Sequence, residues 1–409
     1  MNKVREGYKI TEIGDIPIEW EVRYLEDVCE ILDSYRKPIK ASDREEMKGD
    51  IPYYGASGVI DWINDFIFDE ELILLGEDGE NLNSRNTDLA FKISGKSWVN
   101  NHAHVFRIAN KNRDNIDFMV YYLESKDYSR YIAGSAQPKI TQAQCRKFLL
   151  PSPDLKEQEK IASILSTVDE QIDNVDSLIE KNKELKKGLM QKLLSQGIGH
   201  TAFKKTEIGE IPEEWEVKRV GDITEIKTGG TPSTKCEEYW KDGRIPWMVS
   251  GDVNKGIINS VDGRITESGM NNSAAKLLPK DTVMIALNGQ GKTKGTVAYL
   301  NIEVTCNQSL AGFLPKEEKF YSKYLFYNLQ NRYSEIRGLT GDGARNGLNL
   351  GILRDILIPL PGIEEQRRTA SILSQIDEKI EEYENKKQKL EELKIGLMQK
   401  LLTGEIRVC

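Results

Sequence analysis

Cysteine and histidine are scarce in this chain of 409 residues, which has five cysteines and three histidines. The cysteines lie far apart and no two form a C-x-x-C pair, which argues against a zinc site and against a disulfide framework. We therefore expect intracellular thiols. The histidines, His102, His104 and His200, have no partners at metal-ligand spacing, and we expect His102 and His104 to be packed or hydrogen-bonded on a strand.

Long apolar runs are also missing. No stretch approaches the ~18 consecutive apolar residues of a membrane span, and the first residues form no apolar signal core. These features predict a cytoplasmic protein without a membrane partner. The formal net charge is −8, from 57 Lys and Arg against 65 Asp and Glu, so no global basic field attracts nucleic acid. Any phosphate-binding surface must be local.

Catalytic motifs are incomplete. Residues 289–293, Gly-Gln-Gly-Lys-Thr, follow an apolar stretch as in a phosphate-binding loop, but the full pattern requires glycine where Ala286 stands. The chain has no Asn-Pro-Pro-Tyr motif and no glycine-rich cofactor loop, so adenine methylation cannot be assigned to it. We expect no catalytic residue, metal or cofactor in this chain.

What the sequence does contain is a repeat. Residues 11–22 return, with few changes, as residues 206–217, and residues 188–194 return unchanged as residues 396–402. The second pair has an offset of 208 residues, which also relates Ala162-Ser-Ile-Leu165 to Ala370-Ser-Ile-Leu373. The segments between these repeats barely resemble each other. This organisation predicts one frame that presents two different inserts.

Two stretches have a helical period, because apolar residues recur every three or four positions over more than four heptads. Each stretch follows a Pro-x-Pro sequence and ends near a glycine, Gly197 or Gly404. We predict two long helices that pair antiparallel about a centre near residues 177 and 385, which would oppose Ile172 to Leu390 and Ile179 to Tyr383. The alternative is two separate surface helices. The predicted seam and assembly residues are Leu165, Ile172, Ile179, Leu189, Leu373, Ile380, Leu390 and Leu397, and Leu185 and Leu393 follow the same period.

The inserts have short strand patterns, at residues 71–75, 281–287 and 295–300, and short helical patterns near residues 116–122 and 322–329. The predicted fold class is α+β, with two α/β target-recognition domains separated by the antiparallel helices in a pseudo-twofold internal repeat. The predicted boundaries are residues 1–153 and 201–361 for the two recognition domains, and residues 154–200 and 362–409 for the two helical regions.

The frame resembles the DNA-specificity subunit of type I restriction-modification systems over essentially the whole chain. The resemblance rests on three pairs of repeated sequences: the Gly-Asp/Glu-Ile-Pro-x-x-Trp sequences, the Pro-x-Pro-x-x-x-Glu-Gln sequences at residues 151–158 and 359–366, and the two Gly-Leu-Met-Gln-Lys-Leu-Leu helix ends. The resemblance implies a subunit without catalytic residues that reads a split sequence in double-stranded DNA. It also implies two methyltransferase subunits, which bind S-adenosylmethionine, and restriction subunits, which use ATP and Mg. Two alternatives are a coiled-coil scaffold that binds only protein and a single-chain enzyme with an unrecognised active site.

Candidate DNA-binding residues come from the inserts. The offset of 208 aligns residues 136–140 with residues 344–348, and the flanks match while Gln137 is exchanged for Arg345. Glutamine prefers adenine and arginine prefers guanine, so this exchange predicts different targets for the two domains. The other candidates are amide, hydroxyl, tyrosine and basic side chains that suit base edges or phosphates: Tyr35, Arg36, Lys37, Tyr53, Tyr54, Lys139, Thr228, Thr231, Ser233, Lys235, Lys292, Lys294 and Asn346.

Overall fold

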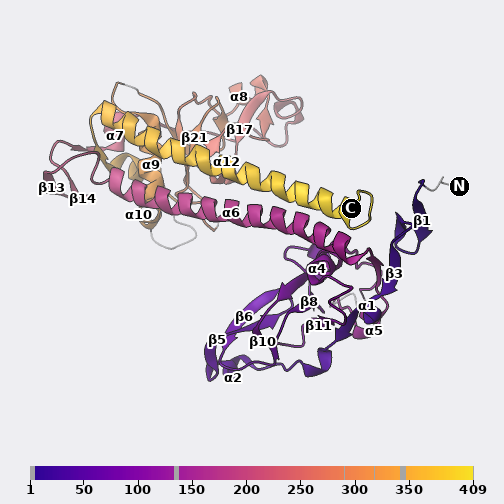
Figure 1. Cartoon of the computed structure of the whole chain (residues 1–409). Helices are drawn as coiled ribbons and strands as arrows, with labels where there is room; N and C mark the ends of the chain where they lie inside the picture. The colour runs from indigo at the N-terminus through magenta and orange to yellow at the C-terminus, as the bar shows by residue number, and fades with distance from the viewer. Residues whose placement is uncertain (1–4, 133–137, 290, 317, 341–346, 409) are drawn as a thin grey trace. The chain divides into compact units, whose positions relative to one another are not determined.

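The computed structural model describes residues 5–132, 138–289, 291–316, 318–340 and 347–408. The chain forms two compact units, unit 1 with Met1–Ser177 and Glu384–Cys409, and unit 2 with Leu178–Tyr383. Each unit combines a mixed β-structure with one half of each of two long helices, so the predicted α+β class and the internal repeat are confirmed (Figure 1).

Unit 1 is built around two four-stranded sheets, with strand orders β4-β11-β8-β9 and β6-β5-β10-β7. The strand at 71–75 predicted from the sequence is β8, whose five residues are all buried. The bounds of these strands are β4 Cys29–Ile31, β5 Lys48–Gly55, β6 Gly58–Ile63, β7 Phe68–Asp69, β8 Leu72–Gly76, β9 Ala90–Ile93, β10 Lys96–Val99 and β11 Ala103–Ile108. The short helices are α1 Leu25–Val28, η1 Asp33–Tyr35, α2 Ala41–Glu45, α3 Asn81–Ser84, α4 Ile116–Ser125 and α5 Gln142–Arg146.

Unit 2 has a five-stranded sheet of order β16-β23-β20-β21-β18 and a three-stranded sheet of order β19-β17-β22. The two sequence-predicted strands of this insert are β20 and β21, and both are fully buried. The strands are β16 Ile226–Thr228, β17 Ile245–Met248, β18 Ile257–Ile258, β19 Arg264–Ile265, β20 Val283–Ala286, β21 Val297–Leu300, β22 Thr305–Cys306 and β23 Leu310–Phe313. The helices are α7 Val220–Ile223, η2 Glu237–Tyr239, η3 Ser250–Lys255, α8 Glu267–Asn271, α9 Ser322–Asn331, α10 Tyr333–Gly338 and α11 Leu350–Asp355.

The repeated sequences at the start of each half form the same local structure. In unit 1 they form the hairpin β1 Tyr8–Thr11 and β2 Gly14–Pro17 and the strand β3 Glu21–Tyr24, which pairs with β12 Leu149–Ser152. In unit 2 they form β13 Phe203–Thr206, β14 Gly209–Pro212 and β15 Glu216–Arg219, which pairs with β24 Leu357–Leu360. The frame predicted from the repeat is therefore a repeated set of backbone pairings.

The two long helices are α6 Leu155–Leu193 and α12 Ile363–Leu401, each 39 residues long. Within each unit they run antiparallel (Figure 1). In unit 1, the ion pairs Asp169–Lys394 and Asp176–Lys387 join them at Oδ1 to Nζ distances of 2.6 and 2.7 Å. Seven residues forward on α6 correspond to seven residues backward on α12. This heptad step confirms the antiparallel pairing about the predicted centre.

The burial of the predicted seam residues is uneven. Leu165, Ile179, Leu373 and Leu390 are buried, whereas Ile172, Leu189, Ile380 and Leu397 are half-buried. The helical period predicts that Leu185 and Leu393 also face the seam, and this prediction is wrong, because the two leucines are 52% and 50% exposed. A pair of helices buries only a narrow stripe of each surface, so a residue that keeps the helical period can still face outward.

A positive backbone angle follows the end of each long helix. Gly404 has φ +71°, and a Cβ there would lie 2.5 Å from Pro17 and 3.1 Å from Trp20. In unit 2, Gly197 has φ +68°, and its Cβ would lie 2.6 Å from Trp215. Glycine is required at both positions because it alone adopts this conformation readily and leaves room for the indole of the repeated Ile-Pro-x-x-Trp sequence.

The repeated Glu-Gln pair holds each frame together. In unit 1, the Glu157 carboxylate accepts a 2.9 Å hydrogen bond from Trp20 Nε1, and in unit 2 Glu365 accepts one of 3.0 Å from Trp215 Nε1. The following glutamine, Gln366 in unit 2, donates to the carbonyl of Pro361 at 2.8 Å, as Gln158 does to Pro153 at 2.9 Å in unit 1. The repeated sequences thus build one hydrogen-bonded framework twice.

Candidate nucleic-acid interface

One end of the central sheet in unit 1 gathers several loops. The turn between β10 and β11, residues 100–102, is tied to the end of β8 because Glu77 N donates to the carbonyl of His102 at 2.9 Å. The segment that follows the sequence-predicted Gln137 reaches the same place, since Ile140 N donates to the carbonyl of Glu77 at 2.8 Å. We call this end of the unit 1 sheet, defined by residues 76–79, 100–102 and 138–140, corner 1.

Unit 2 has an equivalent corner with other side chains. Leu287 N donates to the carbonyl of Ser309 at 2.8 Å, and Leu348 N donates to the carbonyl of Leu287 at 2.9 Å. These are the same two backbone bonds as in unit 1, with Leu287 in the place of Glu77. Corner 2 is defined by residues 286–289, 307–309 and 347–349.

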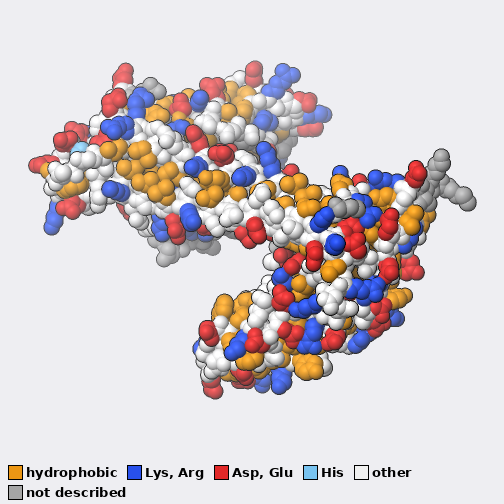
Figure 2. Space-filling model, viewed as in Figure 1, with side chains coloured by type: hydrophobic (Ala, Val, Ile, Leu, Met, Phe, Trp, Pro, Cys, Tyr) orange, Lys and Arg blue, Asp and Glu red, His pale blue; other side chains and the backbone are white. Residues whose placement is uncertain are grey.

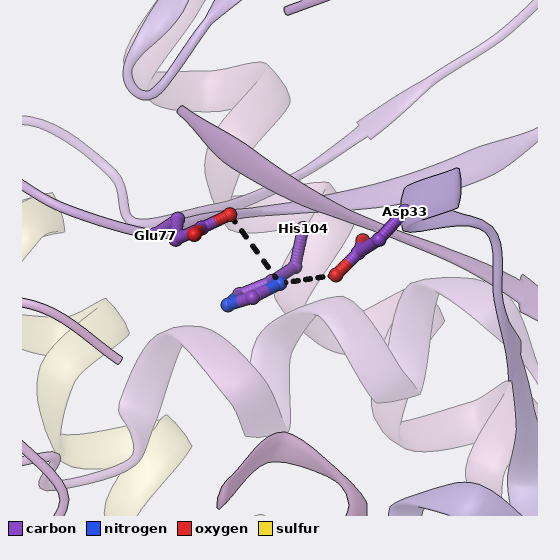
Figure 3. A group of neighbouring side chains, drawn as sticks. All are labelled: Asp33, Glu77 and His104. Carbon is purple, nitrogen blue, oxygen red and sulfur yellow. Dashed lines mark hydrogen bonds and ion pairs between the residues drawn. The ribbon is translucent and has the colours of Figure 1, made fainter. Parts of the chain in front are cut away.

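Corner 1 carries a buried charge network that centres on His104 of β11 (Figure 3). The His104 Nδ1 atom lies 2.7 Å from Asp33 Oδ2 and 3.8 Å from Glu77 Oε2. Two cations complete the network, because Arg36 Nη1 lies 2.5 Å from Glu77 Oε2 and Lys139 Nζ lies 2.7 Å from Glu77 Oε1. Glu77 therefore forms ion pairs with Arg36 and Lys139, two of the residues predicted to bind DNA.

Both ring nitrogens of His104 face acceptors. The Nδ1 atom meets the Asp33 carboxylate, and Nε2 lies 3.0 Å from the carbonyl oxygen of Ile140. Both nitrogens therefore take part in contacts that hold the ring between η1 and the segment 138–140. His104 is hydrogen-bonded on a strand, as the sequence predicted. The prediction was wrong in placing His102 on a strand, because His102 lies in the exposed turn before β11, where its Nδ1 atom is 2.9 Å from Asp78 Oδ1.

A metal ion is a second way to use such a group, because the ligating atoms of Asp33, Glu77 and His104 lie within 4.8 Å of one another. The surrounding charges argue against it. The Arg36 guanidinium and the Lys139 ammonium already satisfy Glu77, and a divalent cation there would be repelled by both. The group is better suited to fixing Arg36 and Lys139 in place.

The network also sets the titration of its carboxylates. Burial raises the pKa of Asp33, but the hydrogen bond and charge of His104, the Val105 N–H and the Arg36 charge outweigh it, so the pKa is lowered overall. Burial also raises the pKa of Glu77, but the hydrogen bonds from Lys139 and Arg36 outweigh it and lower the pKa below its ordinary value. Both carboxylates are therefore held in the charged form.

The other predicted residues of unit 1 occupy different environments. Tyr35 is 59% exposed, and Lys37 is also exposed. Tyr54 is half-buried against Phe91. Tyr53 is only 1% exposed, and its hydroxyl accepts a hydrogen bond from Ile39 N at 2.9 Å. DNA contact by Tyr53 would therefore require the ring to leave the core.

In unit 2, the predicted residues fall in two places. Thr228 ends β16 opposite Ala311, and Thr231, Ser233 and Lys235 are exposed on the loop that follows. Lys292 is exposed between β20 and β21, whereas Lys294 is 9% exposed and donates to Thr340 Oγ1 at 3.0 Å. Gln137, Arg345 and Asn346 lie outside the described residues, and their predicted roles stay predictions.

Surface charge agrees with a local rather than a global binding field. On the face drawn in Figure 2, Lys and Arg side chains are interspersed with Asp and Glu side chains over both units.

Within the described part of the chain, no helix has an apolar stretch long enough to cross a bilayer. Sequence reasoning missed Glu77 and Asp78, because a single acidic pair after an apolar strand resembles any solvated turn.

Comparisons with known proteins give one consistent result. Residues 17–186 and 212–392 match the type I restriction modification DNA specificity domain. The chain is 30% identical to the putative type I restriction enzyme MjaX specificity subunit of Methanocaldococcus jannaschii, with 98% of this chain and 97% of that protein covered. It is 28% identical to the type I restriction enzyme EcoR124I/EcoR124II specificity subunit of Escherichia coli over 63% of this chain and 62% of that one.

Solved structures support the fold. The crystal structure of a type I restriction-modification system S subunit from M. genitalium aligns with a TM-score of 0.65 at 17% identity, covering 98% of this chain and 97% of that chain. The double match of the domain, the nearly full-length relatives and the repeated frame agree: this chain belongs to the family of type I restriction-modification specificity subunits.

Proposed function

We propose that this chain is a non-catalytic subunit that reads a two-part, asymmetric sequence in double-stranded DNA, one part with each unit. It would also hold two methyltransferase subunits, and restriction subunits would join that complex. S-adenosylmethionine, ATP and Mg would be bound by those partners and not by this chain.

The observation that carries the proposal is the difference between the two corners. The backbone bonds of Glu77 and Leu287 to their neighbouring turns are the same, but the side chains differ in charge and size. Equal backbones with different side chains suit two readers of different sequences, because base identity is read by side chains at groove edges.

A non-catalytic role is supported by the environment of three cysteines and two histidines. Burial raises the pKa of the Cys306 thiol to about 12, and it also raises the pKa of Cys29 and Cys145. Buried thiols with a raised pKa are poor nucleophiles. His104 is buried and bonded at both nitrogens, and His200 is bonded to the framework residue Glu365 at 2.9 Å, so neither is placed as a general base for a substrate.

The exposed leucines of the long helices support a partner present in two copies. Leu185 on α6 and Leu393 on α12 are related by the repeat offset, and both are about half exposed. Leu185 belongs to unit 2 and Leu393 to unit 1, so each unit offers the same apolar position. Because the two leucines are equivalent under the repeat and lie in different units, we propose them as a common docking point for two identical subunits.

DNA reading is tested with the complex of this chain and its methyltransferase subunits. Methylated adenines in DNA modified by that complex should define one two-part, asymmetric sequence. A continuous palindrome would contradict the proposal, and complete failure to retain or modify DNA would favour the protein-only scaffold. Turnover by the purified chain alone would contradict the non-catalytic role.

Partner docking is tested with Leu185→Asp and Leu393→Asp. Each variant should lose about half of the co-purified methyltransferase subunit, and the double variant nearly all, because a charge would be desolvated at each docking point. Leu277→Asp is the matched control, since Leu277 is 46% exposed in unit 2 but lies outside the long helices. Normal co-purification with the double variant would contradict this docking surface.

A further inference from the structure

The two corners share a turn that the sequence offset does not reveal. In unit 1, Asn100 N donates to the carbonyl of Tyr54 at 3.1 Å, and Asn100 Oδ1 accepts from His102 N at 2.8 Å. In unit 2, Asn307 N donates to the carbonyl of Met248 at 3.0 Å, and Asn307 Oδ1 accepts from Ser309 N at 3.0 Å. Each turn thus begins with an asparagine whose side-chain oxygen is used by the turn itself.

The residue in the middle of each turn is an exposed amide, Asn101 in unit 1 and Gln308 in unit 2. The asparagine before it fixes the backbone, so the middle side chain can project without being needed for the fold. In unit 2 the side chain is also oriented, because Thr231 Oγ1 donates to Gln308 Oε1 at 2.6 Å. An oxygen held in this way directs the amide nitrogen of Gln308 away from the threonine, and the second lone pair of the oxygen can accept another hydrogen bond.

Both turns lie beside the segments in which the sequence predicted base reading. In unit 1, Asp78 is bonded to His102 of the turn, and it also forms a backbone bridge with Lys139, two residues after Gln137. In unit 2, Leu287 is bonded both to the turn residue Ser309 and to Leu348, three residues after Arg345. The middle amide is therefore an exposed polar group at the same end of the sheet in each unit.

An exposed carboxamide suits one base best. Its oxygen accepts from the adenine N6 amino group while its nitrogen donates to N7, and no other base presents that pair in the major groove. We propose that Asn101 and Gln308 are specificity-determining residues that each read an adenine, one in each part of the DNA target. This inference rests on the proposed function, which supplies the DNA, and adds the base and the residues that contact it.

The test uses the complete complex with its methyltransferase subunits. Asn101→Ala should lower discrimination at one base position of one half-site by roughly 5- to 150-fold, and Gln308→Ala should do the same in the other half-site. Asn101→Asp and Gln308→Glu should shift preference from adenine toward cytosine, because a carboxylate accepts from cytosine N4. The readout is the sequence of the sites that each complex methylates.

Matched controls are Asn112→Ala and Asn331→Ala, which remove exposed amides that lie outside the corners, after β11 and at the end of α9. Both should leave the methylated sequence unchanged. Two-part sites that are unchanged in Asn101→Ala and Gln308→Ala would overturn this inference and leave the proposed function standing. Equal weakening at every site would also overturn it, since that indicates a phosphate contact. A wild-type complex without a two-part site would overturn the proposed function itself.

Discussion

The framework carboxylate Glu157 gives the sharpest stability prediction. Its side chain is 3% exposed, and Arg407 binds both oxygens, with Nε to Oε1 at 2.7 Å and Nη2 to Oε2 at 2.9 Å. Trp20 Nε1 also donates to Oε2 at 2.9 Å. Arg407→Ala would leave a buried carboxylate with only the indole N–H, and this carboxylate fixes the start of α6 to the repeated tryptophan.

The magnitude follows from burial. Removing one partner of a buried ion pair costs about 3–5 kcal/mol. The Arg407 side chain is 29% exposed, so water can reach the vacated space and we expect a smaller loss of ~2–3 kcal/mol in the free energy of unfolding of unit 1. At ~1.4 kcal/mol per tenfold change, amide hydrogen exchange in residues 155–165 should accelerate roughly 30- to 150-fold.

The assay is hydrogen exchange with mass spectrometry, and residues 363–375 of unit 2 serve as an internal reference. Adding Glu157→Gln to Arg407→Ala should recover part of the protection, because the neutral amide needs no cation and can still accept from Trp20. Arg146→Ala is the control, since Arg146 lies 3.6 Å from Glu26 and both side chains are nearly half exposed. Unchanged protection in Arg407→Ala, or no recovery in the double variant, would refute this account of the framework.

Three further predictions concern the helices and corner 1. Leu165→Ala should lower the free energy of unfolding of unit 1 by ~2–5 kcal/mol in urea titrations, because Leu165 is fully buried. Leu185→Ala should change the free energy of unfolding of unit 2 by less than ~0.5 kcal/mol, because Leu185 is 52% exposed. Equal losses in the two variants would contradict the assigned seam. Tyr121→Phe and Tyr327→Phe should each lower the free energy of unfolding by about 1.5–3 kcal/mol in the same titration. The reason is that the two hydroxyls donate to Asp169 at 2.7 Å and to Asp377 at 2.8 Å. A loss in only one of the two variants would show that the units are anchored differently. The pKa values of Asp33 and Glu77 are lowered in the folded state, so their contribution to stability is complete above the unfolded values of 3.8 and 4.5 and is lost as the pH falls through the folded values. Hydrogen exchange across that acid range should show corner 1 opening before corner 2, where Leu287 replaces Glu77, and the reverse order would contradict the charge network.

The sequence by itself determined the frame. The Pro-x-Pro sequences and the two helical periods predicted the long helices, because helix formation depends on neighbours within a few residues. The repeat predicted their antiparallel pairing, since two equivalent inserts require the helices to run in opposite directions, and it also carried the family resemblance. Trp20 and Glu157 could be recognised as repeated residues, since Trp215 and Glu365 match them in sequence. Short strands such as β8 were also predictable, because a run of apolar residues between turn residues needs no knowledge of its partners.

Only the tertiary structure decided which side chains share a surface. Tyr53 and Tyr54 are adjacent in sequence, but strand alternation turns the first into the core and leaves the second half-buried. Leu185 keeps the helical period of Leu165 and is nevertheless exposed, because a period fixes the direction of a side chain around its own helix and not the width of the partner that covers it. The corners depend still more on the fold, since Asp33, Glu77 and His104 come from separate elements and meet only when β11 lies beside both β4 and β8.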